Sequence, residues 1–284
     1  MATPAEDEPS TESGLYETIG LLGGRSAQER YGITRATKVA RLREILSIAR
    51  HYDILHGITP IMLRRLLEEL GPTFVKAGQI LSMRSEILPE SFCNELAKLR
   101  TNVEPMDRDL LLATLRAEYE TPIEDIFDAI DDVPLGSASV AQVHKARLVT
   151  GELVAIKVQR PHVQEIMAQD ISIMRSLAKH ASGMMGSNQF LDLKSVVDEL
   201  WQSFCEETDF LVEARSLEEF KRNNASCRFV DCPKPYPRLC TEHVVVMDYV
   251  DGIPIGQLDE LREAGYDLEE IGTKLVDNYT QQLL

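Results

Sequence analysis

Lys157 and the small residues upstream of it are the part of the sequence best suited to chemistry. Lys157 ends the run Val-Ala-Ile-Lys, and 21 residues before it begins a loop of small side chains: Gly136, Ser137, Ala138 and Ser139. Small side chains let backbone N–H groups approach phosphate oxygens, and a lysine on a rigid strand supplies a compact positive charge. A lysine on a strand is more often simply solvated, and it is the loop that favours a phosphate-binding site.

A lysine in such a site needs a carboxylate to hold it, and the acidic segment 191–219 offers several. This segment contains nine Asp and Glu residues against two Lys and Arg residues. Glu207, Asp209 and Glu213 stand among aromatic and aliphatic residues, and we expect Asp209 and Glu213, four residues apart, to share one face of a helix. For most acids of the segment, a solvated helix face is the simpler interpretation.

Hydrophobic periodicity predicts helices before and after a small sheet, which is an α+β fold. The helices predicted before the sheet cover residues 39–49, 59–71, 73–88, 110–119 and 123–130. Two runs rich in β-branched residues flank Gly151 and predict a β-hairpin, 140–148 paired with 153–158. The rest of the chain is predicted as helices at 164–181 and 191–223, a strand at 244–250 and two short final helices.

The composition is that of an ordinary globular protein. The 284 residues carry a net charge of −16, and 44% of them are hydrophobic. These values exclude collagen-like and disulfide-stapled classes and a generally basic nucleic-acid coat, so no nucleic-acid partner is expected. Five cysteines and an acidic N-terminus without a signal peptide indicate a cytoplasmic compartment. No apolar stretch is long enough to span a bilayer.

The basic segment 25–65 reverses this overall charge, with nine Lys and Arg residues against three Asp and Glu residues. Amphipathic helices with arginine on their polar side bind anionic membranes, so this segment is a candidate for peripheral attachment to an anionic lipid surface. Pairing with the acidic segment 191–219 is an alternative. A solvated helix face is the commoner outcome for such a segment.

Three cysteines near His243 raise the alternative of a zinc site: Cys227, Cys232 and Cys240. Their spacing does not match the closely paired cysteines of structural zinc sites. We therefore favour free buried thiols and predict no metal site in the chain.

Several stretches resemble, in order, the motifs of the UbiB (AarF-type) family of atypical protein-kinase-like proteins. Lys76-Ala77-Gly78-Gln79 resembles the K-x-G-Q segment of that family, and Leu135–His144 resembles its alanine-rich loop. Val154–Pro161 resembles the strand of the nucleotide lysine, with a Q-R-P tail. Glu207-Thr208-Asp209 resembles the E-x-D element, Glu213 the glutamate that pairs with the lysine, and Val246–Gly252 the hinge that holds adenine.

The resemblance implies a site for ATP with Mg²⁺. Lys157 would contact the phosphates and pair with Glu213, beneath the loop Gly136, Ser137, Ala138 and Ser139. Met247 and Tyr249 would lie at the adenine. The helical layer would gate the cleft through Lys76, Gln79, Glu207 and Asp209. In this chain Gly136 and Ser137 stand where many members of the family carry Ala.

The resemblance also implies four regions in the chain. These are a disordered acidic tail (1–14), a helical extension carrying K-x-G-Q (15–130), a kinase-like N-terminal lobe (131–250), and a hinge exit with the first helices of the C-terminal lobe (251–284). No His-x-Asp and no Asp-Phe-Gly occurs after Gly252. We therefore expect the C-terminal lobe, with its catalytic base and Mg²⁺ ligands, to be largely missing.

Two functions remain open on this basis. The first is an ATP-binding, kinase- or ATPase-like protein without catalytic residues of its own in this chain, linked when complete to isoprenoid quinone or other lipid metabolism. The second is a non-enzymatic regulatory or partner-binding helical module that retains the fold.

Overall fold

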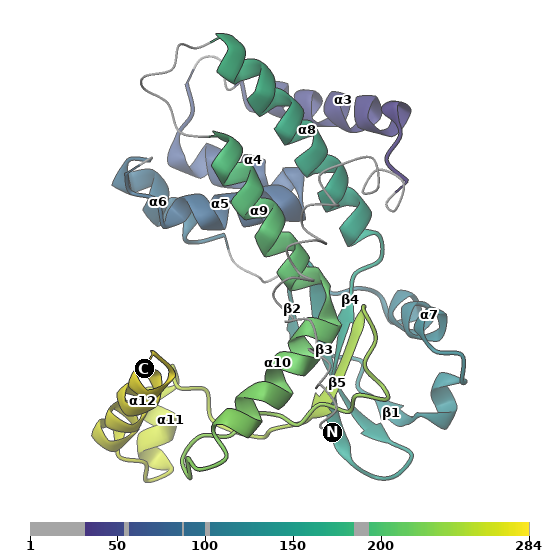
Figure 1. The fold of residues 1–284 in the computed structure, drawn as a ribbon, viewed down its shortest axis with the longest axis vertical. Helices are drawn as coiled ribbons and strands as arrows, with labels where there is room; N and C mark the ends of the chain where they lie inside the picture. Colours follow the sequence, from purple (N-terminus) through teal and green to yellow (C-terminus); the bar gives the residue numbers. More distant parts are fainter. Residues whose placement is uncertain (1–31, 54–56, 87, 100–102, 185–192, 284) are drawn as a thin grey trace, which may run out of the picture. The chain divides into compact units, whose positions relative to one another are not determined.

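The computed structural model describes residues 32–53, 57–86, 88–99, 103–184 and 193–283 (Figure 1). The predicted acidic tail 1–14 and residues 25–31 of the basic segment lie outside them. The chain forms two compact units. The first comprises Met1–Glu104, Ser137–Ala141 and Gln159–Thr208, and the second comprises Pro105–Gly136, Gln142–Val158 and Asp209–Leu284.

The first unit is helical. Its helices are α3 (Arg35–His51), α4 (Pro60–Leu70), α5 (Pro72–Ser82), α6 (Glu90–Leu96), α8 (Val163–Met184) and α9 (Leu193–Thr208). Thr59 caps α4 by accepting a hydrogen bond from the backbone N–H of Met62, and Pro60 stands in the first turn, where its missing N–H costs nothing. Gly71, at φ 100°, ends α4 and starts α5. The short helix α6 was not predicted from the sequence.

Two groups of buried side chains hold this unit together. One joins α5, α8 and α9 through Ile80, Met167, Ile171, Leu200 and Phe204. The other joins α4, α5 and α6 around Leu67, Leu96 and Leu99. The periodicity predicted the helices that carry Leu67 and Ile80 but not α6, which carries Leu96. Burial of such apolar side chains is what stabilises helices of this length.

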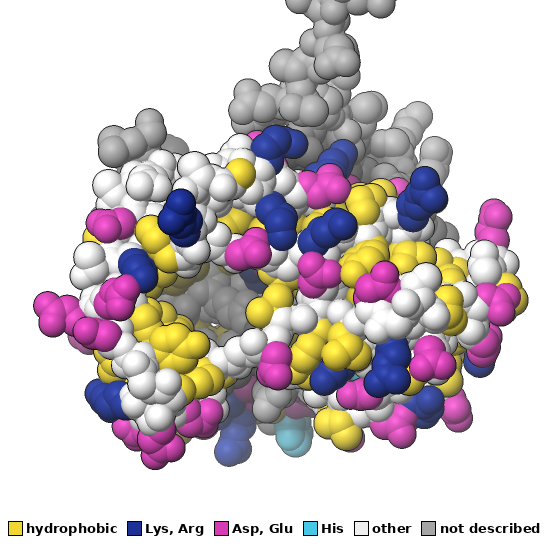
Figure 2. All heavy atoms as spheres, turned by 90° about the horizontal axis from the view of Figure 1, so that it is seen from below, with side chains coloured by type: hydrophobic (Ala, Val, Ile, Leu, Met, Phe, Trp, Pro, Cys, Tyr) yellow, Lys and Arg dark blue, Asp and Glu magenta, His cyan; other side chains and the backbone are white. Residues whose placement is uncertain are grey.

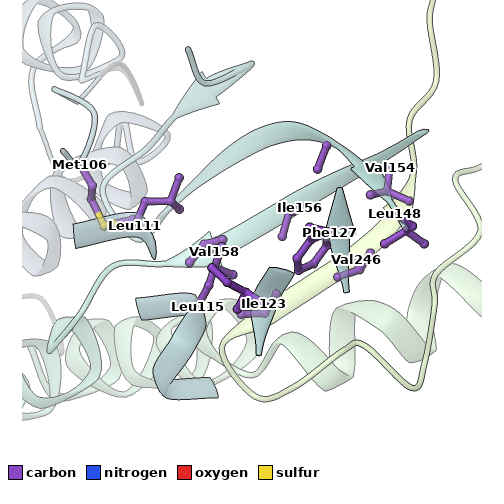
Figure 3. Close-up of a cluster of buried hydrophobic side chains, with 12 residues drawn as sticks. Met106, Leu111, Leu115, Ile123, Phe127, Leu148, Val154, Ile156, Val158 and Val246 are labelled. Atoms are coloured by element: carbon purple, nitrogen blue, oxygen red, sulfur yellow. The ribbon is translucent and has the colours of Figure 1, made fainter. Parts of the chain in front are cut away.

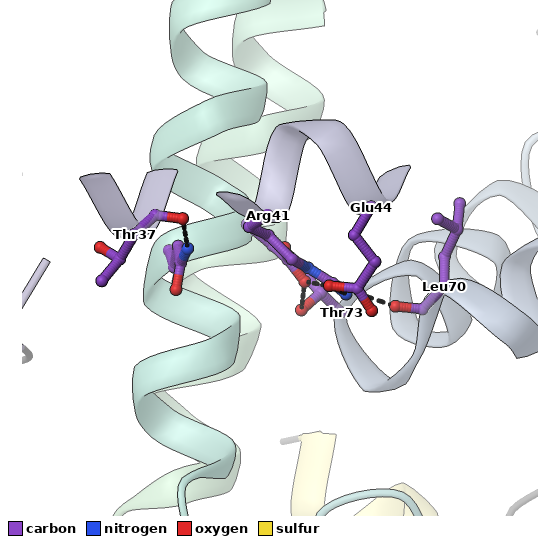
Figure 4. Close-up of polar contacts among 7 residues, drawn as sticks. Thr37, Arg41, Glu44, Leu70 and Thr73 are labelled. Carbon is purple, nitrogen blue, oxygen red and sulfur yellow. Dashed lines mark hydrogen bonds and ion pairs between the residues drawn. The ribbon is translucent and has the colours of Figure 1, made fainter. Parts of the chain in front are cut away.

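A buried ionic network also links the helices of this unit (Figure 4). The carboxylate of Asp170 on α8, which is fully buried, accepts hydrogen bonds from Arg41 Nε (2.8 Å), Arg41 Nη2 (3.0 Å) and Thr73 Oγ1 (2.7 Å). Arg41 Nη2 also donates to the backbone oxygen of Leu70 (2.6 Å). Arg41 therefore ties α3 to α8 and to the end of α4.

The second unit is built on an antiparallel sheet. The strands are β1 (Phe127–Ile130), β2 (Gly136–Ser137), β3 (Ala141–Leu148), β4 (Leu153–Gln159) and β5 (Val244–Asp248). Their order is β1-β3-β4-β5, and β2 pairs with β3. Gly151, at φ 102°, occupies the left-handed position in the turn between β3 and β4, as the predicted hairpin requires. The predicted α+β class with an antiparallel sheet is thus confirmed.

One face of this sheet is covered by α7 (Arg108–Glu118) and the 3-10 turn Ile123–Asp125 (Figure 3). The cluster contains Leu111, Leu115 and Ile123 from these elements and the strand residues Phe127, Leu148, Val154, Ile156, Val158, Val244 and Val246. Val154, Ile156 and Val158 have no exposed surface. These three alternate residues of β4 therefore identify the face of the strand that packs into the core.

Three predicted helices are wrong in part. The helix predicted over 73–88 ends at Ser82, as α5. Residues 127–130 of the predicted helix 123–130 form β1, because they pair with β3 across a long stretch of sequence, from Phe127 opposite Leu148 to Ile130 opposite Ala146. The predicted helix 191–223 is two helices, α9 and α10 (Phe210–Asn223), which are separated at Asp209. Periodicity is local and detects neither a distant partner strand nor a break between two apolar stripes.

The second unit ends in α11 (Leu258–Glu263) and α12 (Leu268–Leu283). Asn278 on α12 donates through Nδ2 to Oδ1 of Asn224 at the end of α10 (2.9 Å). In the view from below, hydrophobic patches alternate with acidic and basic side chains (Figure 2). No helix among the described residues is long and apolar enough to cross a membrane.

Candidate functional site

Lys157 projects from a strand that is otherwise built for burial. In β4 it lies opposite Val245 of β5, between Ile156 and Val158, which are fully buried on the core face. Because side chains alternate along a strand, Lys157 points to the other face. Its side chain retains 27% of its exposure, so the ammonium group is held by the sheet and still reaches solvent.

The carboxylate of Glu213 meets this lysine. Lys157 Nζ donates to Glu213 Oε2 at 2.5 Å, and the same Nζ lies 4.6 Å from the centre of the Phe210 ring. The pairing implied by the family resemblance is therefore present in the structure. The aromatic face adds a cation–π attraction, so two side chains of α10 hold the lysine from different directions.

Asp209 sets the start of α10 and thereby the position of Glu213. The Asp209 carboxylate caps the helix by accepting a hydrogen bond from the Leu211 N–H (3.1 Å). The next residue, Phe210, is buried, and its N–H donates to the backbone oxygen of Glu242 (3.1 Å). The expectation that Asp209 and Glu213 share one helix face is wrong, since Asp209 precedes the helix.

The predicted hinge Val246–Gly252 begins within β5, which pairs with β4. Met247 pairs with Ala155, and the Tyr249 N–H donates to the backbone oxygen of Leu153 (3.1 Å). The ring of Tyr249 lies 4.3 Å from Lys145 Nζ. Both predicted hinge residues thus lie at the end of β5, in the same unit as Lys157.

The loop of small residues is held by an arginine that sequence reasoning did not single out. Arg160, directly after β4, donates through Nε to the backbone oxygen of Ala138 (2.8 Å) and through Nη2 to Ser137 Oγ (2.8 Å). Its pKa is lowered because the guanidinium is partly buried. The only signal in the sequence was its place in the Q-R-P tail. Among the predicted loop residues, Gly136 belongs to the second unit, whereas Ser137, Ala138 and Ser139 belong to the first.

A buried polar relay fixes the strand that follows the loop. Gln142 Oε1 accepts a hydrogen bond from the backbone N–H of Met106 (2.7 Å). Gln142 Nε2 lies 2.7 Å from His144 Nε2, and His144 Nδ1 lies 2.8 Å from the backbone oxygen of Asp131. A backbone N–H can only donate, so the amide nitrogen of Gln142 must face His144. His144 must then accept at Nε2 and donate from Nδ1, which is the neutral form. Burial lowers the pKa of His144 and thereby also favours the neutral form.

The K-x-G-Q residues lie on α5 in the first unit. Lys76 forms an ion pair with Glu207 at the end of α9. Gln79 donates instead through Nε2 to the backbone oxygen of Leu99 (3.0 Å). The structure therefore joins the K-x-G-Q lysine to the first acid of Glu207-Thr208-Asp209, while Gln79 anchors the chain after α6.

The three cysteines near His243 are free thiols. Cys227, Cys232 and Cys240 are only partly buried, which corrects the prediction that they are buried. The thiols of Cys232 and Cys240 donate to the backbone oxygens of Leu217 (3.3 Å) and Val246 (3.5 Å), and burial raises the pKa of both. Within the described ranges, no three His, Cys, Asp or Glu side chains gather as a metal site.

An antiparallel sheet that carries a lysine–glutamate pair, with a loop of small residues before it, is the arrangement of a kinase-like domain. Residues 98–284 match the ABC1 atypical kinase-like domain. The chain belongs to this family, and the membership predicted from the motifs is confirmed.

Two relatives illustrate the family. The chain is 39% identical over 254 residues to an uncharacterized protein in the hydrogenase 1 5' region of Clostridium pasteurianum, covering 86% of this chain and 48% of the relative. It is 36% identical over 241 residues to the chloroplastic protein ACTIVITY OF BC1 COMPLEX KINASE 1 of Arabidopsis thaliana, covering 82% of this chain and 35% of the relative. The chain thus spans half or less of the length of these relatives.

Among solved structures, the chain is similar to Rv3197 of Mycobacterium tuberculosis in its complex with erythromycin. The TM-score is 0.48 at 23% identity, over 79% of this chain and 53% of that one.

Proposed function

We propose that this chain binds ATP through the kinase-like sheet, with Lys157 at the phosphates. The observation that carries the proposal is the ion pair of 2.5 Å between Lys157 and Glu213. It supports the proposal because a lysine held by a carboxylate and an aromatic ring has a fixed direction, as a phosphate clamp requires. Gly136, Ser137, Ala138 and Ser139 would cover the phosphates, and Met247 and Tyr249 would contact the adenine.

The donors in this part of the chain fit the phosphates better than they fit a metal ion. An ammonium group and small-residue backbone amides bind phosphate oxygens, whereas Mg²⁺ takes carboxylate oxygens and water. When bound, Mg²⁺ would neutralise phosphate charge. We propose that it arrives with the nucleotide, and that Lys76, Gln79, Glu207 and Asp209 regulate access to the site.

Binding of a non-hydrolysable ATP analogue by calorimetry tests the nucleotide proposal. Lys157→Ala should weaken binding at least about tenfold, which corresponds to one lost charge-assisted contact. Lys221→Ala is the matched control, because Lys221 lies on α10 in an exposed ion pair with Asp231. Equal affinity of Lys157→Ala and the control would contradict the proposal.

For the longer proteins of this family we propose a phosphotransferase or ATPase activity linked to isoprenoid quinone or other lipid metabolism. In that proposal residues 131–250 act as the N-terminal lobe, 15–130 as the gating extension and 251–284 as the start of the next lobe. Because the sequence holds no His-x-Asp after Gly252, we expect ATP binding by this chain without hydrolysis. An ATPase assay of the 284-residue chain decides between a turnover-competent enzyme and a regulatory module that only retains the fold.

We also propose peripheral contact of α3 with an anionic membrane. None of the 17 residues of α3 is buried, and Val39 and Leu46 expose 39% and 44% of their surface. Arg35, Arg43 and Arg50 are exposed on the same helix. A basic face with apolar side chains suits the headgroup region of a membrane. The proposed location is the cytoplasmic side of a membrane, although the Arabidopsis relative is named as chloroplastic.

Co-sedimentation with vesicles tests this contact. Binding should increase with the fraction of anionic lipid and decrease at least about thirtyfold in Arg43→Glu/Arg50→Glu, since each of the two basic residues near the surface contributes about 1 kcal/mol. Arg147→Glu, a change at an exposed arginine of β3, is the control. Binding that does not depend on anionic lipid would contradict the proposal.

A further inference from the structure

Thr241, in the turn before β5, has a hydroxyl whose role is fixed by its neighbours. Its Oγ1 accepts hydrogen bonds from the backbone N–H groups of His243 (3.1 Å) and Val244 (3.0 Å). The Thr241 N–H donates to the backbone oxygen of Val244 (2.8 Å), which closes the turn. Because two donors already point at Oγ1, the hydroxyl proton is available to an acceptor. That acceptor is Glu118 Oε2, at 2.8 Å.

Glu118, the last residue of α7, holds this turn with both carboxylate oxygens. Its Oε2 accepts from Thr241, and its Oε1 lies 2.9 Å from His243 Nδ1. An ionised carboxylate only accepts, so His243 donates from Nδ1. The Glu118 side chain retains 20% of its exposure, which limits competition from water for these two bonds. The turn therefore cannot move relative to α7 without breaking the bonds at Glu118.

The turn presents one backbone oxygen to α10. The oxygen of Glu242 accepts from the N–H of Phe210 (3.1 Å), and Phe210 is the first residue of α10. The N–H groups in the first turn of a helix have no partner within the helix, so Glu242 supplies an acceptor that α10 itself lacks. The turn thus sets where α10 begins, together with the cap at Asp209.

The start of α10 decides the direction of Lys157. The Lys157 Nζ lies 4.6 Å from the centre of the Phe210 ring and 2.5 Å from Oε2 of Glu213, one helical turn later. In β5, the strand that follows the turn directly, Val245 lies opposite Lys157. The turn therefore fixes both the helix that holds the ammonium group and the strand beside the lysine backbone. All of these residues belong to the second unit.

We infer that Thr241 and Glu118 are positioning residues for the nucleotide lysine. They act through the backbone oxygen of Glu242 and the ring of Phe210, and they contact no ligand themselves. This inference rests on the proposed nucleotide site. A lysine that is already held in its binding direction loses less freedom when phosphate binds. Loss of the turn should therefore weaken the contact with phosphate and leave contacts with the base unchanged.

Two substitutions of Thr241 test the inference by calorimetry with a non-hydrolysable ATP analogue and with adenosine. Thr241→Val removes the hydroxyl and should weaken binding of the analogue about fivefold, the effect of one neutral hydrogen bond. Thr241→Ser keeps the hydroxyl and should bind as wild type. Glu118→Gln should behave as Thr241→Val, because an amide cannot accept at both ends. Affinity for adenosine should not change in any of these variants.

Thr114→Val is the matched control, because it removes a hydroxyl on the exposed side of the same helix, α7, where Thr114 donates to the Leu110 oxygen (2.7 Å). It should bind both ligands as wild type. Urea denaturation of every variant identifies a general loss of folding. Glu118→Gln provides the comparison if Thr241→Val does not fold, since it places no methyl group in the turn.

Nuclear magnetic resonance adds a readout that needs no nucleotide. The ring current of Phe210 shifts the resonances of the Lys157 methylene protons next to Nζ, which are assigned by their loss in Lys157→Ala. In Thr241→Val and Glu118→Gln these resonances should move towards the position of an unstructured lysine. In Thr241→Ser and Thr114→Val they should stay in place.

The outcomes separate this inference from the proposed function. If Lys157→Ala weakens binding of the analogue while folded Thr241→Val and Glu118→Gln do not, the inference is wrong and the nucleotide site stands. Equal losses for the analogue and for adenosine, or for Thr241→Ser and Thr241→Val, also overturn it. If the wild-type chain binds neither ligand, the nucleotide site is refuted, whereas unmoved Lys157 resonances refute the positioning by themselves.

Discussion

Lys157 and Glu213 are separated by 56 residues of sequence, and their side chains meet at 2.5 Å. One residue is fixed by the register of β4 against β5, and the other by a helix that Asp209 caps. The pair keeps 27% and 33% of its side-chain exposure, so water screens its attraction. Its contribution to the free energy of unfolding is therefore small, and its importance lies in directing the lysine.

Glu213→Gln separates the contribution of the ion pair to stability from its role in directing Lys157. We expect the free energy of unfolding to fall by less than about 1 kcal/mol, as for exposed ion pairs. Affinity for the ATP analogue should fall by about tenfold, because the lysine is no longer held in one direction. Urea denaturation and calorimetry on the same preparation measure the two effects. Glu219→Gln, at an exposed position of α10, should change neither quantity, and a larger loss of stability than of affinity would argue for a structural role.

Asp170→Asn should destabilise the first unit strongly. Asp170 is fully buried and carries the charge that balances Arg41, and loss of one partner of a buried ion pair costs about 3–5 kcal/mol. The control is Asp198→Asn, which removes an exposed partner of Arg175 and should cost less than about 1 kcal/mol. Equal denaturation midpoints for the two variants would refute this account of the network.

Gly78→Ala and Gly272→Ala should change stability in opposite directions. A Cβ at Gly78 would overlap side-chain atoms of Leu99 and would stand 2.7 Å from Leu67 Cδ1, whereas a Cβ at Gly272 meets nothing within 4 Å. Alanine favours a helix by about 1 kcal/mol over glycine, and overpacking costs about 1–3 kcal/mol. We expect Gly272→Ala to raise the melting temperature and Gly78→Ala to lower it. An increase in both would show that the leucines move aside freely.

His144 should make stability depend on pH. Burial, assisted by the charge of Arg108, holds the pKa of His144 below its ordinary value. The unfolded chain then takes up a proton more readily than the folded chain. The stabilisation by neutral His144 is therefore complete above about pH 6.5, the pKa of the unfolded residue, and declines as the pH falls further.

His144→Gln keeps one donor and one acceptor but does not titrate. The difference in unfolding free energy between wild type and this variant should therefore shrink from about pH 8 to about pH 5, measured by urea denaturation at each pH. A difference that stays constant across this range would show that His144 is not the titrating group.

The sequence was most informative where a pattern is local. The β-hairpin around Gly151 and the helix from Pro60 were predicted close to their observed bounds, because turn and capping residues mark them. Strand β1 was missed, because Phe127–Ile130 becomes a strand only by pairing with β3. The residues that hold the loop show the same limit, since nothing near Arg160 in the sequence indicates that its side chain reaches Glu104, 56 residues before it.

The candidate site was predicted in a similarly uneven way. Lys157 was singled out from its residue type and from the loop before it. Glu213 was first one of three candidate carboxylates, and the family resemblance then selected it as the partner of Lys157. The separation of Asp209 from Glu213 was not found, because helical spacing assumes an unbroken helix and the break depends on burial of Phe210. The relay through Gln142 and His144 was also missed. Its direction follows from which atoms can donate, and this becomes visible only when the partners are in place.

The network around Asp170 also has a consequence for the folding pathway. Arg41 lies 129 residues and Thr73 lies 97 residues from Asp170 in sequence. Contacts over such separations require large chain loops to close first, so we expect them to form after the local helices and after most of the rate-limiting barrier. Loss of Asp170 should then accelerate unfolding while leaving the refolding rate nearly unchanged. A buried charge of this kind would therefore set how long the folded helical unit persists, through its unfolding rate, and not how quickly the unit forms.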